Sequence, residues 1–87
     1  MPEYIVISNL WDEREKTSPH RNDHLEYLSK LKKMGNLRIA GKFSDGSGGI
    51  YILEAESYDQ AIDLAKADPY HSHSLRKYTI KEWERKF

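Results

Sequence analysis

The first strand-like segment of the chain, EYIVISNLW at residues 3–11, is apolar on both of its alternating faces. One set of alternating side chains contains Tyr4, Val6 and Leu10, and the other contains Ile5, Ile7 and Trp11. Successive side chains of a strand point to opposite faces of a sheet, so a sheet built around this strand needs cover on both faces. The segment GIYILEAE, residues 49–56, is also largely apolar on both of its alternating faces.

The segment after this strand reads as a charged loop and a helix. The loop is DEREKT, residues 12–17, and Ser18 followed by Pro19 is typical of a helix start, with serine as the cap. The helix is expected to run to about Lys33 or Met34, where Gly35-Asn36 ends it.

The remaining segments alternate in the same way. NLRIAGKF (36–43) and GIYILEAE (49–56) are predicted strands joined by the turn SDGSGG, and LRKYTIKEW (75–83) is a fourth strand. Between them, Ser57 and Gln60 form a capping box that opens a second helix. That helix should end near Asp68, because Pro69 lacks an amide proton and crowds the preceding turn.

The order β-α-β-β-α-β predicts an α+β, ferredoxin-like fold with an antiparallel sheet and both helices on one face. With 87 residues, the chain is expected to be a single domain, residues 1–87. Two helices cover only one face of the sheet, so we expect a homodimer packed sheet on sheet, as a dimeric α/β barrel. A long loop or the C-terminal tail is the alternative cover.

Composition excludes several classes of function. The chain has 14 basic and 14 acidic residues, and this balance speaks against a nucleic-acid or membrane partner. It has no cysteine, so disulfides and thiol chemistry are excluded. We see no signal peptide and no apolar run of the ~20 residues that cross a bilayer, and therefore expect a cytoplasmic protein.

Each predicted helix carries one polar residue on its apolar face. His24 falls within a stripe made of Leu25, Tyr27, Leu28, Leu31 and Met34, with His20 one turn earlier and Arg21 at its side. Asp68 falls within the arc made of Tyr58, Ala61, Ile62, Leu64 and Ala65. An ionised carboxylate on an apolar face is costly unless it is paired, and a histidine is an obvious partner.

The residues alone leave the pairing open. With both helices running in roughly the same direction, His24 near the start of one and Asp68 at the end of the other are expected at opposite ends of the layer. Asp23, a backbone group or another chain could then be the partner of His24. His24 also fits a purely structural core histidine, and Asp68 fits a common Asp-Pro turn.

The other histidines suggest no defined site. His20 and His24 have the i, i+4 spacing of two metal ligands, and His71 and His73 could add to them. The spacing matches no zinc signature, so we predict no metal and no cofactor. His71 and His73 are expected in a solvated loop.

Several short motifs, in order, resemble the YCII-related (YciI-like) domain family. They are Arg21-x-x-His24-Leu25, Gly35-x-Leu37-x-x-Ala40-Gly41, Ala61 and Asp68-Pro69-Tyr70, and the resemblance extends to the tail KEWERKF. It implies a dimeric α/β barrel with a histidine–aspartate active-site pair, His24 and Asp68, lining a pocket beside the sheet. Gly41 and Tyr70 are the substrate-binding candidates among the matched motifs. The chain departs from the family pattern at two places. The family often has proline at the position of Lys42, and it usually has small residues at the positions of His71, Ser72 and His73.

The family is similar to enzymes of small cyclic metabolites, including one class that eliminates chloride from a chlorinated hydroxyquinol. We therefore expect a cofactor-independent lyase or isomerase, or a hydrolase, acting on a small molecule. His24 would be the general acid or base, Asp68 would orient it, and Arg21 would bind an anionic group. The alternatives are a non-catalytic ligand-binding or accessory dimer, and a structural histidine–aspartate pair.

Overall fold

The computed structural model describes residues 1–10 and 20–87. Its elements, in chain order, are β1 (Glu3–Leu10), α1 (Arg21–Lys33), β2 (Leu37–Lys42), β3 (Gly48–Glu54), α2 (Tyr58–Lys66), α3 (Pro69–Ser72) and β4 (Arg76–Trp83). The strand order in the single four-stranded sheet is β2-β3-β1-β4, and every neighbouring pair is antiparallel. This arrangement confirms the predicted ferredoxin-like α+β fold, with one short helix added.

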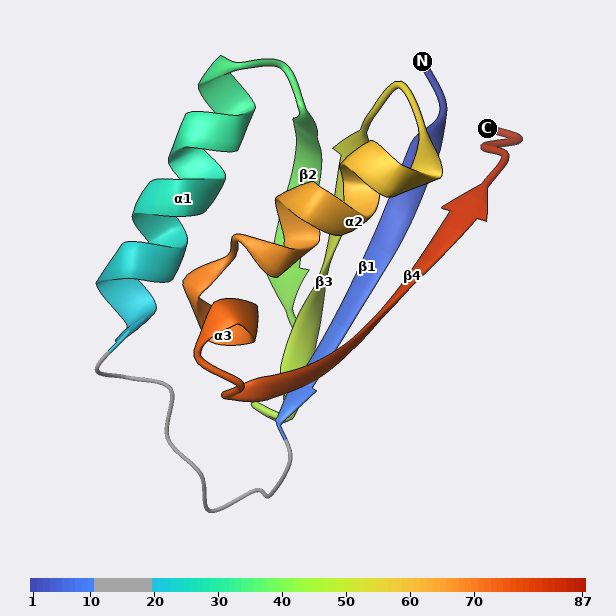
Figure 1. Cartoon of the computed structure of the whole chain (residues 1–87). Helices are drawn as coiled ribbons and strands as arrows, with labels where there is room; N and C mark the ends of the chain where they lie inside the picture. The colour runs from blue at the N-terminus through green and yellow to red at the C-terminus, as the bar shows by residue number, and fades with distance from the viewer. Residues whose placement is uncertain (11–19) are drawn as a thin grey trace.

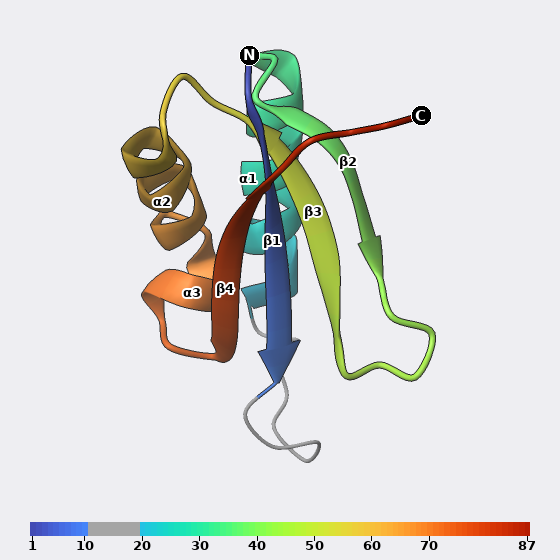
Figure 2. The same ribbon diagram turned by 90° about the vertical axis from the view of Figure 1, so that its right-hand side faces the viewer.

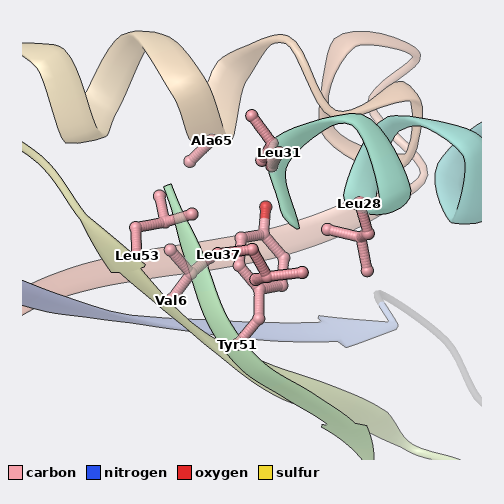
Figure 3. Close-up of a cluster of buried hydrophobic side chains, with 7 residues drawn as sticks. All are labelled: Val6, Leu28, Leu31, Leu37, Tyr51, Leu53 and Ala65. Atoms are coloured by element: carbon pink, nitrogen blue, oxygen red, sulfur yellow. The ribbon is translucent and has the colours of Figure 1, made fainter. Parts of the chain in front are cut away.

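All three helices lie on the same side of the sheet (Figures 1 and 2). The inward-facing side chains of β1 and β3 meet those helices in the core, which Figure 3 shows in close-up. The main cluster consists of Val6, Leu28, Leu31, Leu37, Tyr51, Leu53 and Ala65, and a smaller one of Tyr4, Ala55 and Ala61. Within the described part of the chain, no helix is long and apolar enough to cross a membrane.

The two long helices run in opposite directions, so the predicted common direction is wrong. Each helix turns back along the strand that precedes it, and those strands, β1 and β3, are antiparallel. In Figure 1, α1 starts at the lower end of the sheet and α2 runs down toward it. The start of α1 and the end of α2 therefore lie at the same end of the helical layer.

The helix boundaries follow local capping chemistry. Ser57 Oγ accepts from the Gln60 amide at 3.1 Å, and Gln60 Oε1 accepts from the Glu56 amide at 2.6 Å, so the predicted cap is present. Gly35, with φ +83°, follows α1 and confirms the predicted stop. Met34, expected on the apolar stripe, is instead 59% exposed. The predictions for residues 11–19 (the end of the first strand, the charged loop, the Ser18 cap and Pro19) lie outside the described residues.

The segment around Asp68 differs from the prediction. The second helix ends at Lys66, and a further single turn, α3, starts at Pro69. Asp68 is the cap of this turn, and its Oδ1 accepts from the Tyr70 amide at 2.9 Å. Proline is favoured at the first helical position, where its missing amide proton is not needed, so Asp-Pro starts a helix here and does not only stop one.

Candidate active site

A cavity of about 580 Å³ opens between the first turns of α1, the turn between β2 and β3, and α3. Gly48 and Gly49 of β3 line the cavity, and the neighbouring strands approach them too closely for a side chain. A Cβ at Gly48 would collide with the Ser8 carbonyl oxygen, and one at Gly49 with the Gly41 carbonyl oxygen. Larger residues at these two positions would therefore displace the strand backbone below the cavity.

His24 and Asp68 are in direct contact at the edge of this cavity. His24 Nδ1 lies 2.8 Å from Asp68 Oδ1 and 3.0 Å from Oδ2. His24 lines the cavity with its side chain 16% exposed, whereas Asp68 is fully buried behind it. The expected separation at opposite ends of the layer is therefore wrong, and the antiparallel helices are the reason.

The surroundings of Asp68 keep it ionised. Besides His24, it accepts hydrogen bonds from the Tyr51 hydroxyl at 3.0 Å and from the Tyr70 amide. Burial alone would raise the pKa of this carboxyl, but the hydrogen bond and charge of His24, with the Tyr70 amide, hold it below its ordinary value. Burial, together with the charge of the same carboxylate, raises the pKa of Tyr51. The fold thus holds a buried carboxylate that accepts hydrogen bonds from His24, Tyr51 and the Tyr70 amide.

This contact also fixes the tautomer of His24. An ionised carboxylate only accepts hydrogen bonds, so Nδ1 of His24 carries the proton. In the neutral imidazole, Nε2 is then left with its lone pair, as a proton acceptor. The geometry can therefore remove a proton from a bound molecule and hold the resulting imidazolium against Asp68.

Tyr70 and Arg76 complete the wall beside His24. The Tyr70 ring stacks on the His24 imidazole, with centroids 4.0 Å apart and planes 11° apart. The Arg76 guanidinium carbon lies 4.4 Å from the centroid of the same tyrosine ring. Tyr70 is buried and lines the cavity, so it restricts the orientation of the His24 ring.

Basic side chains dominate the charge of the cavity. Arg21, Lys42 and Arg76 line it, and no carboxylate belongs to the described lining residues. The predicted candidate Gly41 also lines it, but a Cβ there would meet no atom within 4 Å, so space does not demand glycine. The arrangement favours a ligand with at least one negative charge.

The remaining histidines form no metal centre in the described residues. His20 stacks on His73 with ring centroids 4.4 Å apart, and Nδ1 of His24 is occupied by Asp68. Residues 1–10 and 20–87 contain no group of three or more histidine, aspartate or glutamate side chains that could hold a metal ion.

His71 was expected in a solvated loop, and this prediction is wrong. Its side chain is buried, with the residue only 7% exposed. Its Nε2 lies 2.8 Å from Ser8 Oγ, and its Nδ1 lies 2.8 Å from the Ala65 carbonyl oxygen. Ser8 is the one polar residue in the inward set of β1, Tyr4, Val6, Ser8 and Leu10, and this interruption was the available signal. No local sequence pattern indicated that Arg76 would line the cavity, because its place beside Tyr70 depends on how β4 passes α3.

Comparisons with known proteins agree with the fold and the motifs. Residues 2–84 match the family profile of the YCII-related domain. The chain is 39% identical over 67 residues to the uncharacterized protein YjpA of Bacillus subtilis (strain 168), covering 77% of this chain and 79% of that protein.

Among solved structures, 5-chloro-2-hydroxyhydroquinone dehydrochlorinase (TftG) from Burkholderia phenoliruptrix AC1100, in complex with 2,5-dihydroxybenzoquinone, superposes with a TM-score of 0.80. It covers 99% of this chain and 96% of its own at 22% identity, a likeness that establishes the fold. Because the family profile spans nearly the whole sequence, the chain belongs to the YCII-related domain family.

Proposed function

We propose that this protein is a cofactor-independent enzyme that removes a proton from a small organic anion, with His24 as the general base. The observation that carries the proposal is the contact of His24 Nδ1 with both carboxylate oxygens of the buried Asp68, at 2.8 and 3.0 Å, on the wall of a cavity. A histidine whose tautomer is fixed by an ionised carboxylate is suited to acid–base catalysis.

In this proposal the two residues have separate roles. His24 Nε2 takes a proton from a C–H or O–H group of the substrate, and the released electron pair either expels a leaving group or shifts within the molecule. Asp68 stabilises the imidazolium that forms. His24 can then return the proton to the product or to water, so elimination and isomerisation both fit this pair. In hydrolysis, His24 would instead take the proton from a water that attacks the substrate and return it to the leaving group.

The cavity lining supports an anionic, partly apolar substrate. Arg21, predicted to bind an anionic group, lies there with Lys42 and Arg76. Leu25, Leu28 and the Tyr70 ring supply apolar surface for a flat molecule. TftG is named for eliminating chloride from a hydroxylated ring, which makes small oxygenated rings the first substrates to test.

The test compares the wild-type protein with His24→Gln. Binding of 2,5-dihydroxybenzoquinone is measured by calorimetry, and turnover is measured on a panel of small hydroxylated rings that includes 5-chloro-2-hydroxyhydroquinone, followed by chloride release and absorbance. We expect His24→Gln to lower turnover by about 10²–10⁴-fold, the usual contribution of a general base.

His73→Gln is the matched control, because His73 is an exposed histidine that does not line the cavity, and it should keep wild-type turnover. Circular dichroism verifies that both variants are folded. Binding of the probe with no turnover of any panel compound above the His24→Gln background would favour a ligand-binding module over an enzyme.

We also propose that a second copy of the chain covers the open face of the sheet. In the described residues no helix packs on that face, where Ile5 and Ile7 are partly exposed and Ile39 is 60% exposed (Figure 2). Sedimentation velocity should show a dimer that Ile7→Lys weakens and that Asp63→Lys, on an exposed position of α2, does not. A wild-type monomer at micromolar concentration would contradict this assembly.

A further inference from the structure

Ser8 lies in the middle of the sheet, at a buried position that lines the cavity. On β1 it pairs with Gly49 of β3 on one side and with Tyr78 of β4 on the other. Gly49 has no side chain to cover it, and Ser8, although only 4% exposed, lines the cavity. Its hydroxyl therefore lies between a buried region on the β4 side and the ligand space.

The buried side is occupied by His71, whose imidazole is held on three sides. Nδ1 lies 2.8 Å from the Ala65 carbonyl oxygen, Nε2 lies 2.8 Å from Ser8 Oγ, and the ring stacks on Tyr78 at 4.0 Å. A carbonyl oxygen only accepts hydrogen bonds, so Nδ1 must carry a proton. Burial lowers the pKa of His71 and so favours the neutral form, in which Nε2 carries none.

The direction of the Ser8 hydrogen bond follows from this tautomer. Nε2 of neutral His71 is an acceptor, so the single hydroxyl proton of Ser8 is directed at it. The lone pairs of Ser8 Oγ are then the only part of the hydroxyl left for a ligand. Ser8 thus enters the cavity as a fixed acceptor, whereas a serine without this partner could rotate and either donate or accept.

We propose that Ser8, held by His71, determines substrate specificity by accepting a hydrogen bond from a hydroxyl group of the bound anion. This inference rests on the proposed function, because it concerns the same cavity, and it narrows the substrate class to small hydroxylated anions. Arg21, Lys42 and Arg76 supply donors for the negative charge, and Ser8 supplies an acceptor for the neutral hydroxyl. A molecule with an ether oxygen in place of the hydroxyl would leave Ser8 without a donor.

A structural role for the pair predicts a different result. A buried serine hydroxyl and a buried imidazole need hydrogen-bond partners in any protein, and each satisfies the other here. A pair with that role alone would change stability when altered, and it would not change the ratio of affinities for two ligands that differ in one hydroxyl. Ligand selectivity is therefore the readout that separates the two roles.

The experiment uses benzoate, its three hydroxy isomers and the three matching methoxy isomers as probes, with affinities from calorimetry. We expect the wild type to bind at least one hydroxybenzoate about three- to tenfold more tightly than benzoate or the matching methoxybenzoate, the range of one net hydrogen bond. In Ser8→Ala this ratio should fall to about one. Ser72→Ala, an exposed serine on α3, is the control and should keep the wild-type ratio.

A second variant tests the part played by His71. In His71→Asn the amide nitrogen can replace Nδ1 at the Ala65 carbonyl, but nothing replaces Nε2 at Ser8. The Ser8 hydroxyl is then free to donate, so methoxy isomers should gain affinity relative to hydroxy isomers. Nitrogen-15 chemical shifts of His71 provide a check without any ligand, and they should show the proton on Nδ1 of the wild type.

The outcomes separate this inference from the proposed function. Hydroxyl selectivity that persists in Ser8→Ala, or a His71 proton found on Nε2, would overturn the role of Ser8 and leave the His24 proposal intact. Failure of every benzoate to bind would contradict the anion-binding cavity itself, and the inference about Ser8 would fall with it.

Discussion

Two imidazoles, His24 on α1 and His71 on α3, differ chiefly in what accepts their Nδ1 proton. His24 donates to the carboxylate of Asp68, whereas His71 donates to the carbonyl oxygen of Ala65. Both acceptors fix the same tautomer and leave Nε2 with its lone pair. Only His24 contacts the carboxylate directly. The charge of Asp68 also favours protonation of His71, but burial outweighs it there and lowers the pKa of that imidazole.

This difference separates a base from an orienting group. A carbonyl dipole holds a neutral imidazole in place, and burial then disfavours its protonation. A buried carboxylate supports the charged form that a base must adopt during turnover. Under the proposed function, the fold uses histidine twice within a small region, once as a base that exchanges protons with a ligand and once to direct a hydroxyl.

Removing the Asp68 carboxylate is expected to have the largest effect on stability, because only the His24 site contains this charge. Asp68→Ala leaves the Tyr51 hydroxyl, the Tyr70 amide and His24 without their acceptor, and the loss of one partner of a buried pair costs about 3–5 kcal/mol. Urea denaturation should show a loss of this size in the free energy of unfolding. The exposed Asp63→Ala is the control, with a change within about 0.5 kcal/mol.

Replacing Tyr51 with phenylalanine tests its hydrogen bond to Asp68 and keeps the ring that stacks against His71 at 6.4 Å. Tyr51→Phe keeps the buried ring but removes one donor to the carboxylate, and hydrogen bonds to charged groups contribute about 1.5–3 kcal/mol. The free energy of unfolding should fall by that amount, with the nitrogen-15 shifts of His71 unchanged. A shift in the His71 signals would mean that the two imidazoles are coupled through Tyr51.

His71→Asn should cost less than the loss of Asp68. It removes the hydrogen bond to Ser8 and the stacking on Tyr78 but leaves no buried charge without a partner, so we expect about 1–2 kcal/mol. His73→Asn, at an exposed histidine, should change stability by no more than about 0.5 kcal/mol. A cost for His71→Asn that equals that of Asp68→Ala would remove the distinction between the two sites.

The smallest effect is on the pH dependence of stability. Burial lowers the pKa of His71 below its ordinary value of 6.5, so between these two values the unfolded chain binds a proton that the folded protein does not. The His71 contribution to the free energy of unfolding should therefore be constant above pH 6.5 and decline as the pH falls below it. His71→Asn should remove this decline, and an identical pH profile in the two proteins would contradict it.

The sequence carried the identity of His24 and Asp68 but not their contact. In the predicted pattern both residues interrupt an apolar helical face, and that pattern is local, although Asp68 lies beyond the end of α2. Whether they meet depends on the relative direction of two helices, which is set by the antiparallel pairing of β1 and β3. The element order was predictable for the same reason that the contact was not: each element is a local pattern, and their geometry arises from pairing over long sequence distances.

The second imidazole was missed for a different reason. Asp-Pro was interpreted as a stop, and the short helix that it starts has too few residues to show a helical period. Once α3 forms, His71 turns inward against Ala65 and Ser8, residues 6 and 63 positions away. Ser8 alone offered a local sign, as a polar residue among inward apolar ones.

The single turn of α3 has a consequence for anyone who would change what this cavity accepts. Asp68, Tyr70 and His71 lie within four consecutive positions of the chain, so an insertion or a shift there would disturb both imidazoles at once. The opposite rim of the cavity consists of Ala40, Gly41 and Lys42, which are exposed. Among the described residues, no side chain of this rim hydrogen-bonds to the His24–Asp68 pair or to the Ser8–His71 pair. A library for altered ligand preference should therefore diversify the β2 rim and leave residues 68–71 constant.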